Sequence, residues 1–277
     1  MSDGGRLVVV GTPLGNLDDL STRAVGALRE ASVIACEDTR RTGRLLAAIG
    51  VDARELLVVN EHTEHDVAPR IVDRVRRGDV VALVSDAGMP GVSDPGALLV
   101  RAVVDADGDV SVVPGPSAAS TAVAGSGIPA ARWVFEGFLP RKGAERTRRL
   151  HGIATEERAV VLYEAPHRVA RTLEDLVALG DETRPVAIGR ELTKLHEEWF
   201  RGTVADAVAW IDAQEPRGEF VFVLGGAVPA GEPTDAELRR ALHVALDRGD
   251  STRDAVAAVS QSFGVAKRRV YELALGR

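Results

Sequence analysis

The sequence predicts an α/β protein in which two α/β domains are followed by a small helical tail. Short apolar runs rich in β-branched residues alternate with amphipathic stretches through most of the chain, a rhythm typical of β-α-β units. The runs of the first half show little polar alternation, which indicates a parallel sheet covered by helices on both faces. A length of 277 residues with 45% hydrophobic composition supplies apolar side chains for such cores.

The first domain, residues 1–124, is expected to hold one parallel sheet. Helical segments separate its strands, because apolar residues recur three or four positions apart between the apolar runs. The predicted strands are Leu7–Val10, Val33–Ala35, Leu56–Val59, Val80–Val84 and Val110–Val113. The predicted helices are Leu17–Ala31, Thr39–Ile49, Asp66–Arg77 and Gly96–Ala106.

The second domain, residues 125–230, follows the loop that begins at Gly125 and repeats the strand rhythm. Its predicted strands are Trp133–Gly137, Ala159–Tyr163, Val186–Gly189, Glu198–Gly202 and Phe220–Leu224. After a predicted linker, Pro229–Pro233, residues 231–277 are expected to form a helical tail. The tail helices are Asp235–Arg248, Thr252–Phe263 and Ala266–Leu275, with Gly264 as the turn between the last two.

Composition and the absence of targeting signals predict a cytoplasmic protein without a membrane partner. A single cysteine, Cys36, cannot form an internal disulfide, and no apolar run approaches the roughly 20 residues that span a bilayer. Residues 1–6 show no basic stretch leading into an apolar segment, so we expect no secretion signal. The net charge of −7 argues against a general polycation but is compatible with a local nucleic-acid site.

Four loops rich in glycine, proline and polar residues follow predicted strands. Ligands of an open parallel sheet bind beyond the carboxyl ends of its strands, which is where these loops begin. Glycine lets the backbone approach a ligand closely, and proline holds a loop in one shape. One such loop is most often only a tight turn, but four at one edge indicate a pocket. The loops are Gly11–Leu17, Cys36–Arg40, Ser85–Gly96 and Pro114–Ser120.

Motifs for several other ligands are missing. Gly11–Gly15 lacks the dinucleotide-binding spacing, no phosphate-binding P-loop is present, and Ser117 does not stand in a serine-hydrolase motif. His62 and His65 could share a helical face, but without further ligands they are weak evidence for zinc. We therefore expect no metal site.

Two regions are basic although the net charge of the whole chain is negative. Arg141–Arg149 carries five basic side chains and one acidic, and Ser251–Arg277 carries five and two. A solvated helix face is the ordinary explanation of one charge cluster, yet either region could bind phosphate, and the last two tail helices resemble a helix-turn-helix. The candidate RNA contacts are Arg40, Arg141, Lys142, Arg146, Arg148, Arg149, Arg190, Lys267, Arg268 and Arg269.

Ordered motifs across the chain resemble those of the tetrapyrrole-methylase-like (class III) S-adenosylmethionine-dependent methyltransferases, in particular the branch that modifies small-subunit ribosomal RNA. The match runs from about Leu7 to Leu224, and the tail segment Phe263–Tyr271 extends it. The motifs that carry it are Gly11–Leu17, Glu37–Arg40, Ser85–Gly96, Pro114–Ser117, Glu136–Pro140, Tyr163–Arg168 and Arg190–Lys194.

The resemblance implies methylation of the ribose 2′-oxygen of a cytidine in the decoding region of 16S rRNA, within the small ribosomal subunit. It also implies a homodimer and S-adenosylmethionine held in the cleft between the two α/β domains. By the same resemblance, the cofactor pocket is lined by Leu14, Asp86, Met89, Ser117 and Ala118 of the first domain and by Tyr163, Gly189 and Glu219 of the second.

Methyl transfer to a hydroxyl requires alignment of the two reactants and an acceptor for the hydroxyl proton. The sequence does not rank the charged residues at the cleft rim, each of which could instead be a helix cap or an ion-pair partner. The candidates are Asp94, Glu37, Asp38, Glu191 and Lys194.

Two alternatives stay open. Another enzyme of this class could methylate a tetrapyrrole or a modified protein side chain, because a fold does not fix the acceptor. The two basic regions favour RNA over a small acceptor. A non-catalytic RNA-binding module would leave the four loops unexplained.

Overall fold

The computed structural model describes residues 4–52, 55–228, 233–247 and 249–275. Backbone packing divides the chain into two compact units, Met1–Ala227 and Val228–Arg277. Most of the predicted linker Pro229–Pro233, and the expected boundary between residues 230 and 231, lie outside the described residues. Residues 1–3, part of the segment 1–6 in which we looked for a secretion signal, also lie outside the described residues.

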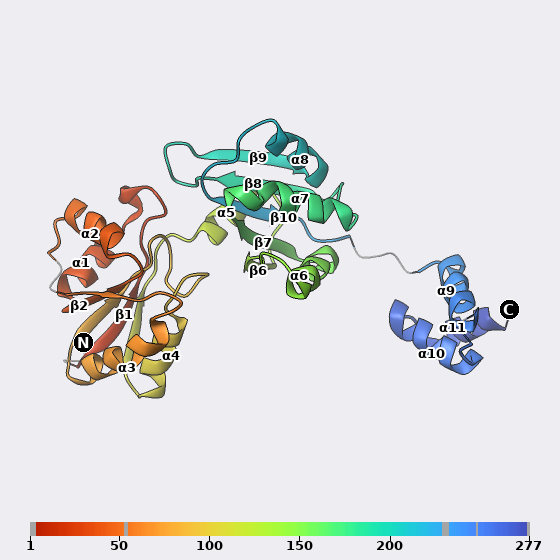
Figure 1. The fold of residues 1–277 in the computed structure, drawn as a ribbon, viewed down its shortest axis with the longest axis horizontal. Helices are drawn as coiled ribbons and strands as arrows, with labels where there is room; N and C mark the ends of the chain where they lie inside the picture. The colour runs from red at the N-terminus through yellow and green to blue at the C-terminus, as the bar shows by residue number, and fades with distance from the viewer. Residues whose placement is uncertain (1–3, 53–54, 229–232, 248, 276–277) are drawn as a thin grey trace. The chain divides into compact units, whose positions relative to one another are not determined.

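The first unit begins with a parallel sheet in the order β3-β2-β4-β1-β5 (Figure 1). Its strands are β1 Arg6–Val10, β2 Val33–Cys36, β3 Leu56–Val58, β4 Val80–Leu83 and β5 Asp109–Val113. The predicted parallel sheet is therefore confirmed. Since β4 and β5 flank β1, the winding direction reverses beside β1, and open sheets of this kind bind ligands at that point.

Helices cover both faces of this sheet, as its apolar strands predict. The helices are α1 Thr22–Glu30, α2 Thr39–Ala48, α3 Glu64–Arg76 and α4 Ala97–Asp105, with a short 3₁₀ turn η1 Leu17–Asp19. Alternate residues of a strand face opposite sides. Leu7 of β1 packs with Ile71 of α3 and Leu99 of α4. Val8 points the other way and packs with Leu28 of α1.

A second sheet follows, in the order β6-β7-β10-β8-β9. Its strands are β6 Trp133–Phe138, β7 Ala159–Glu164, β8 Pro185–Arg190, β9 Glu198–Thr203 and β10 Phe220–Leu224. The strands match the prediction, but only β6 and β7 run parallel, and the other pairs are antiparallel. An apolar run indicates that a strand is buried, but it does not indicate the direction in which the strand runs. The mixture of parallel and antiparallel pairs was therefore not predictable from composition.

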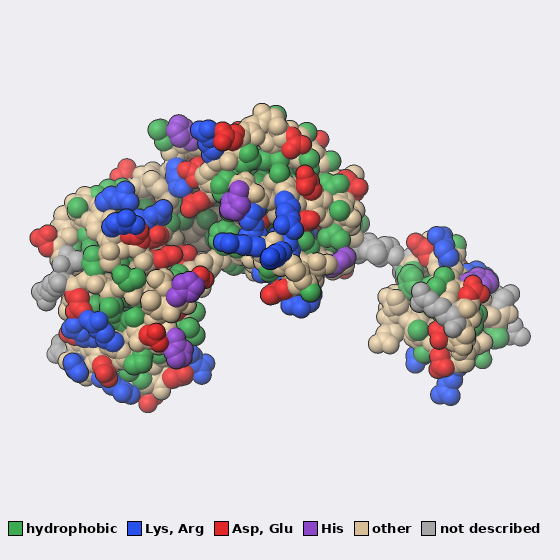
Figure 2. Space-filling model, viewed as in Figure 1, with side chains coloured by type: hydrophobic (Ala, Val, Ile, Leu, Met, Phe, Trp, Pro, Cys, Tyr) green, Lys and Arg blue, Asp and Glu red, His purple; other side chains and the backbone are tan. Residues whose placement is uncertain are grey.

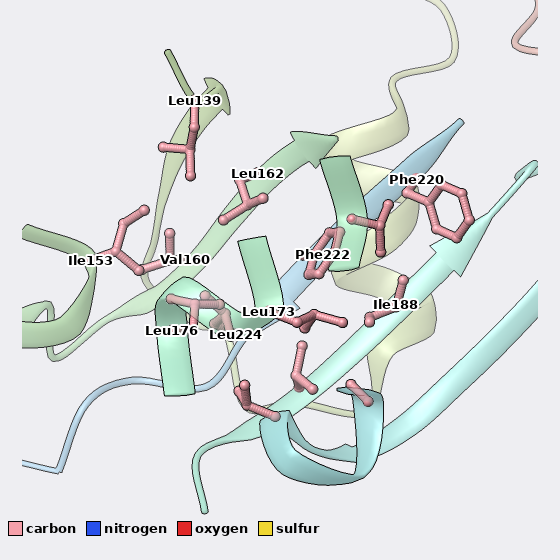
Figure 3. Close-up of a cluster of buried hydrophobic side chains, with 14 of the residues drawn as sticks. Leu139, Ile153, Val160, Leu162, Leu173, Leu176, Ile188, Phe220, Phe222 and Leu224 are labelled. Atoms are coloured by element: carbon pink, nitrogen blue, oxygen red, sulfur yellow. The ribbon is translucent and has the colours of Figure 1, made fainter. Parts of the chain in front are cut away.

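The second sheet also carries helices on both faces: α5 Ala118–Ser126, α6 Ala144–Thr155, α7 Val169–Ala178 and α8 Val204–Asp212, with a 3₁₀ turn η2 Pro166–Arg168. Phe222 and Ile188 pack with Leu173 of α7 in one core (Figure 3). On the opposite face, Ala122 of α5 packs with Val221. The expected domain boundary between residues 124 and 125 thus falls inside α5, which packs on the second sheet.

The second unit consists of α9 Asp235–Asp247, α10 Thr252–Phe263 and α11 Lys267–Ala274. Leu238 and Leu242 of α9 pack with Val259 of α10 and Val270 of α11 in a core of their own. Gly264 ends α10 with φ +63°, the left-handed conformation that glycine adopts most easily, as the predicted turn requires. None of the described helices is both long and apolar enough to cross a membrane.

Candidate active site

A cavity of about 390 Å³ opens beyond the carboxyl ends of β1 and β4 and is completed by residues of the second sheet. This volume lies in the range of about 300–1,000 Å³ that is usual for small-molecule sites. The structure brings together most of the residues that the sequence assigned to a pocket. Those that line the cavity are Leu14, Glu37, Asp86, Met89, Asp94, Ser117, Ala118, Tyr163 and Glu219.

Close backbone approach joins the loops after β1, β4 and β5. Thr12 and Gly88 exchange backbone hydrogen bonds of 2.8 and 3.1 Å, which link the first loop to Ser85–Gly96. A Cβ atom on Gly11 would stand 2.6 Å from Cα of Gly115, so both positions require glycine. These loops therefore form one continuous wall of the cavity.

The loop Ser85–Gly96 is anchored by a buried carboxylate that sequence reasoning missed. Oε1 of Glu64, in α3, accepts hydrogen bonds from the backbone N–H groups of Gly96 at 2.9 Å and Leu98 at 2.8 Å. Glu64 is 6% exposed. Its charge stabilises the N-terminus of α4 and fixes the end of the loop that carries Asp86 and Asp94.

Three carboxylates face this cavity from the first sheet. Burial raises the pKa of Asp94 to about 7, repulsion from Glu37 adds to the shift, and a hydrogen bond from Ser85 opposes it. Burial also raises the pKa of Glu37, with a further contribution from Asp86. Burial raises the pKa of Asp86 too, although Arg41, whose Nε lies 3.5 Å from its carboxylate, opposes that shift.

The second sheet contributes an aromatic wall and a buried carboxylate. The hydroxyl of Tyr163 accepts a hydrogen bond of 3.1 Å from the N–H of Ala119, and burial raises its pKa. The ring of Phe138 meets that of Tyr163 edge to face, with centroids 5.5 Å apart. Glu164, which is 1% exposed, accepts a hydrogen bond of 2.7 Å from the hydroxyl of Thr172. Phe138 and Glu164 both line the cavity.

Of the five catalytic candidates, the structure places only Glu37 and Asp94 on the cavity wall. Asp38 instead caps α2. Its carboxylate accepts hydrogen bonds from the backbone N–H groups of Arg40 at 2.7 Å and Arg41 at 3.4 Å. A cap role was the ordinary alternative for this residue.

Glu191 and Lys194 form an ion pair at the edge of the cavity. Nζ of Lys194 lies 2.8 Å from carboxylate oxygens of both Glu191 and Glu219. Burial opposes the charge of Lys194, but these carboxylates raise its pKa. Burial likewise opposes the charge of Glu191, but the hydrogen bond from Lys194 lowers its pKa. Both are therefore held in their charged forms, and neither lines the cavity.

Gly189 does not line the cavity either. It is buried in β8, and a Cβ atom there would stand 2.7 Å from Leu192, which covers it and lines the cavity in its place. Sequence reasoning also missed Arg41, in the first turn of α2, which lines the cavity and lies 3.5 Å from the carboxylate of Asp86. The other lining residues that were missed are Ala87, Gly88, Val92, Ser93, Phe138, Glu164, Ala165, Phe220 and Val221.

The predicted RNA contacts divide into exposed and occupied side chains. Arg146 is 3% exposed and donates to Asp175 at 2.6 Å and to Thr172 at 3.0 Å. A phosphate contact would leave the buried partners of Arg146 unpaired, so Arg146 is not proposed to bind RNA. Arg149 donates to the side chain of Glu136 at 2.8 Å, and Arg190 is paired with Glu198 at 2.8 Å.

Arg40, Arg141, Lys142 and Arg148 remain exposed on the surface of the first unit. Figure 2 shows Lys and Arg side chains gathered over the region of β7 and α6. In the second unit, Lys267 and Arg268 are exposed.

Arg269 is held against α9, where it donates to Asp235 at 2.9 Å and to the carbonyl of Pro233 at 2.8 Å. The prediction that it contacts RNA therefore conflicts with its role in joining α11 to the start of α9.

His62 and His65 do not belong to a larger cluster of ligands. Within the described residues, no group of three or more His, Cys, Asp and Glu side chains is arranged to hold a metal ion.

Solved structures of methyltransferases share the fold of the first unit. The methyltransferase CobJ covers 81% of this chain and 95% of its own, with 23% identity and a TM-score of 0.62. Uroporphyrin-III C-methyltransferase from Thermus thermophilus, complexed with S-adenyl homocysteine, covers 80% of this chain and 97% of its own, with 21% identity and a TM-score of 0.57.

Sequence comparisons are more specific. Residues 6–208 match the Tetrapyrrole (Corrin/Porphyrin) Methylases family, and residues 232–277 match the RsmI C-terminal HTH domain. Proteins named ribosomal RNA small subunit methyltransferase I are similar over nearly the whole chain. The one from Synechocystis is 39% identical over 98% of each chain, and the one from Xylella fastidiosa is 41% identical over 98% of this chain and 99% of its own.

The relative from Thermotoga maritima, with the same name, is 45% identical and matches 80% of this chain and 99% of its own. Together the family match and these relatives show that the chain belongs to the tetrapyrrole methylase family, beside the ribosomal RNA small subunit methyltransferases I, and is an S-adenosylmethionine-dependent methyltransferase.

Proposed function

We propose that this methyltransferase modifies the ribose 2′-hydroxyl of a cytidine in the decoding region of 16S rRNA, within the small ribosomal subunit. One observation carries the proposal: the acidic cavity adjoins an exposed basic segment. Phe138 lines the cavity, and Arg141 and Lys142 follow it by three and four residues. The names of the relatives support the same substrate.

The cavity suits S-adenosylmethionine by size, charge and backbone shape. Asp86, Glu37 and Asp94 present carboxylates to a cationic ligand, and Gly88, with φ +82°, leaves space that a Cβ atom would fill 3.3 Å from Leu14. When bound, S-adenosylmethionine supplies a methyl group on a positively charged sulfur. Leu14, Met89, Ser117, Ala118, Tyr163 and Glu219 are the further residues proposed to hold it.

Asp94 is the proposed acceptor of the hydroxyl proton. Burial raises the pKa of this carboxyl to about 7, and an acceptor works best near neutral pH. Glu37 stands beside it and opposes its ionisation, which makes the bound proton more stable. Glu191 and Lys194 are proposed to orient Glu219 through their shared ion pair.

The RNA backbone is proposed to lie along Arg40, Arg141, Lys142 and Arg148, all of which are exposed. Hydrogen bonds from buried or half-buried arginines hold the residues that precede Arg141 and Lys142. Arg168 donates to the carbonyl of Leu139 at 2.5 Å, and the carbonyl of Pro140 accepts from Arg146 at 3.1 Å. The segment is thereby fixed beside the cavity.

A ribosomal substrate implies a cytoplasmic enzyme, and we include a homodimer in the proposal. Support for an interface comes from exposed apolar side chains on two adjacent elements. Leu98 and Val104 of α4 are 51% and 53% exposed, and Val112 of the edge strand β5 is 50% exposed. Apolar surface of this kind commonly marks a contact between proteins.

A tetrapyrrole or a modified protein side chain is the competing acceptor, and the basic segment beside the cavity does not favour it. A non-catalytic module does not agree with membership in a methyltransferase family.

The test is transfer of radiolabelled methyl groups from S-adenosylmethionine to four acceptors: small subunits, large subunits, naked 16S rRNA and uroporphyrinogen. The subunits come from cells that lack this enzyme. We expect label in the small subunit alone or in preference to the others. Label in the tetrapyrrole, or equal label in both subunits, would contradict the proposed substrate.

A further inference from the structure

An open groove of about 510 Å³ runs between α10 and α11 of the second unit. Val270 and Leu273 point into the core of the three helices. The spacing of a helix therefore leaves Lys267, Arg268 and Tyr271 on the outward face, and all three are exposed. Arg253, in the first turn of α10, forms the opposite wall.

The groove is positively charged although the whole chain carries −7. Arg253, Lys267 and Arg268 line it beside one carboxylate, Glu272. Arg268 is paired with Glu272 at 3.0 Å. Within the described part of the chain, no carboxylate lies within ion-pair distance of Arg253 or Lys267, so both are available to an anionic partner.

Tyr271 adds an aromatic face to these cations. It is 49% exposed and lies one helical turn after Lys267, on the same side of α11. A cation beside an exposed aromatic ring matches the two parts of a nucleotide, because the phosphate meets the charge and the base stacks on the ring. Bases inside a duplex are already stacked, so the ring favours an unpaired strand.

We infer that the groove between α10 and α11 binds an unpaired stretch of RNA, with phosphates on Arg253 and Lys267 and one base stacked on Tyr271. The inference rests on the proposed RNA substrate and assigns that substrate a second contact, distinct from the basic segment beside the cavity. Arg269 has no part in it, since its hydrogen bonds hold α11 to α9.

The test measures binding of the full chain to a fluorescein-labelled RNA strand of mixed sequence, alone and annealed to its complement, by fluorescence anisotropy. Tyr271→Ala should weaken binding of the single strand by about 5- to 100-fold, whereas Tyr271→Phe, which keeps the ring, should bind like the wild type. The duplex should bind more weakly than the single strand and should not respond to Tyr271→Ala.

Charge reversals test the phosphate contacts. Lys267→Glu and Arg253→Glu should each lower the slope of log affinity against log salt by about 0.7, the value for one phosphate of a single strand. Arg240→Glu is the matched control, because Arg240 is an exposed cation of the same unit that lines a different groove, beside Val244 and Phe263. It should leave both affinity and slope unchanged.

Equal binding by Tyr271→Ala and wild type would overturn the inference, as would equal losses in all three charge reversals. Methylation of small subunits by the wild type is measured in parallel. Failure of the wild type to methylate RNA would refute the proposed function itself. If the wild type methylates small subunits and Tyr271→Ala binds RNA normally, only the inference that the groove binds RNA is refuted.

Discussion

At the scale of single residues, the cavity concentrates negative charge beside Arg41. Glu37, Asp86 and Asp94 each have a raised pKa, because burial penalises their charged forms and neighbouring carboxylates repel them. The loop that holds two of them also contains Ser93, a non-glycine residue with φ +63°. Strain of this kind concentrates at binding sites and is maintained by surrounding contacts, here the hydrogen bonds to Glu64.

Asp94→Asn should lower the single-turnover rate of methyl transfer by about 10²- to 10⁴-fold, the usual contribution of an acceptor for a proton. The wild-type rate should rise with pH through about 7, because the carboxylate must be ionised to accept the proton. Asp38→Asn is the matched control. Its side chain caps α2, asparagine caps equally well, and the rate should stay near that of the wild type.

The same carboxyl makes stability depend on pH. Its folded pKa is raised from 3.8 to about 7, so the folded state binds its proton more tightly than the unfolded state does. The stability from this proton is fully present below pH 3.8 and is lost as pH rises through about 7. Thermal unfolding should therefore show Asp94→Asn gaining stability relative to the wild type as pH rises from 4 to 8. A constant difference would contradict this account.

Asp86→Ala should weaken S-adenosylmethionine binding by about 1–3 kcal/mol, the usual effect of leaving buried donors unpaired. Asp86 lines the cavity and also accepts a hydrogen bond of 3.2 Å from the N–H of Asp38, so its loss removes both the proposed ligand contact and support for the start of α2. Isothermal titration gives the affinity. An unchanged affinity would show that this carboxylate faces away from the ligand.

At the scale of elements, most strands were predictable because they are apolar runs, whereas the burial of Arg146 in α6 was not anticipated. Arg146 lies on the same stripe as Leu150 and Ile153, at helical spacings of four and seven residues, and is buried with them. That spacing was present in the sequence but was outweighed by the local run of arginines. Its partner Asp175 lies 29 residues away in α7, and no local pattern indicates such a contact.

Arg146 and Arg148 should therefore respond in opposite ways to substitution by alanine. Arg146→Ala should lower the free energy of unfolding by about 2–3 kcal/mol, because buried acceptors at Thr172 and Pro140 lose their donor. Arg148→Ala should change it by less than about 0.5 kcal/mol, since that side chain is exposed, and should instead weaken RNA binding. Urea denaturation and RNA anisotropy separate the two effects, and similar profiles for both variants would contradict the assignment.

At the scale of the whole molecule, the positions of the loops at the carboxyl ends of β1 and β4 predicted where the cavity lies, and this held for most of its lining. Gly189 and the second-sheet residues Leu192 and Glu164 were misjudged or missed. Their places depend on the antiparallel pairing of β10 with β8 and with β7, which the sequence does not encode locally. The proposed domain division, 1–124, 125–230 and 231–277, likewise depends on packing rather than on composition.

A chain ending at Gly231 should fold and bind S-adenosylmethionine like the full chain, because the cavity residues all lie in Met1–Ala227 and the second unit has its own core. It should lose much of its methylation of small subunits through weaker substrate capture. Cofactor titration checks the first part, and single-turnover methylation at subunit concentrations below saturation checks the second. Loss of cofactor binding would mean that residues 232–277 support the core fold.

The most direct test of the central claim is nucleoside mass spectrometry of 16S rRNA from small subunits incubated with S-adenosylmethionine and either wild type or Asp94→Asn. The account predicts that the wild type forms 2′-O-methylcytidine at one position in the decoding region, and that the variant, even when saturated with S-adenosylmethionine, forms little or none. A methyl group on a base, on a different nucleotide, or formed at equal rates by both proteins would contradict it.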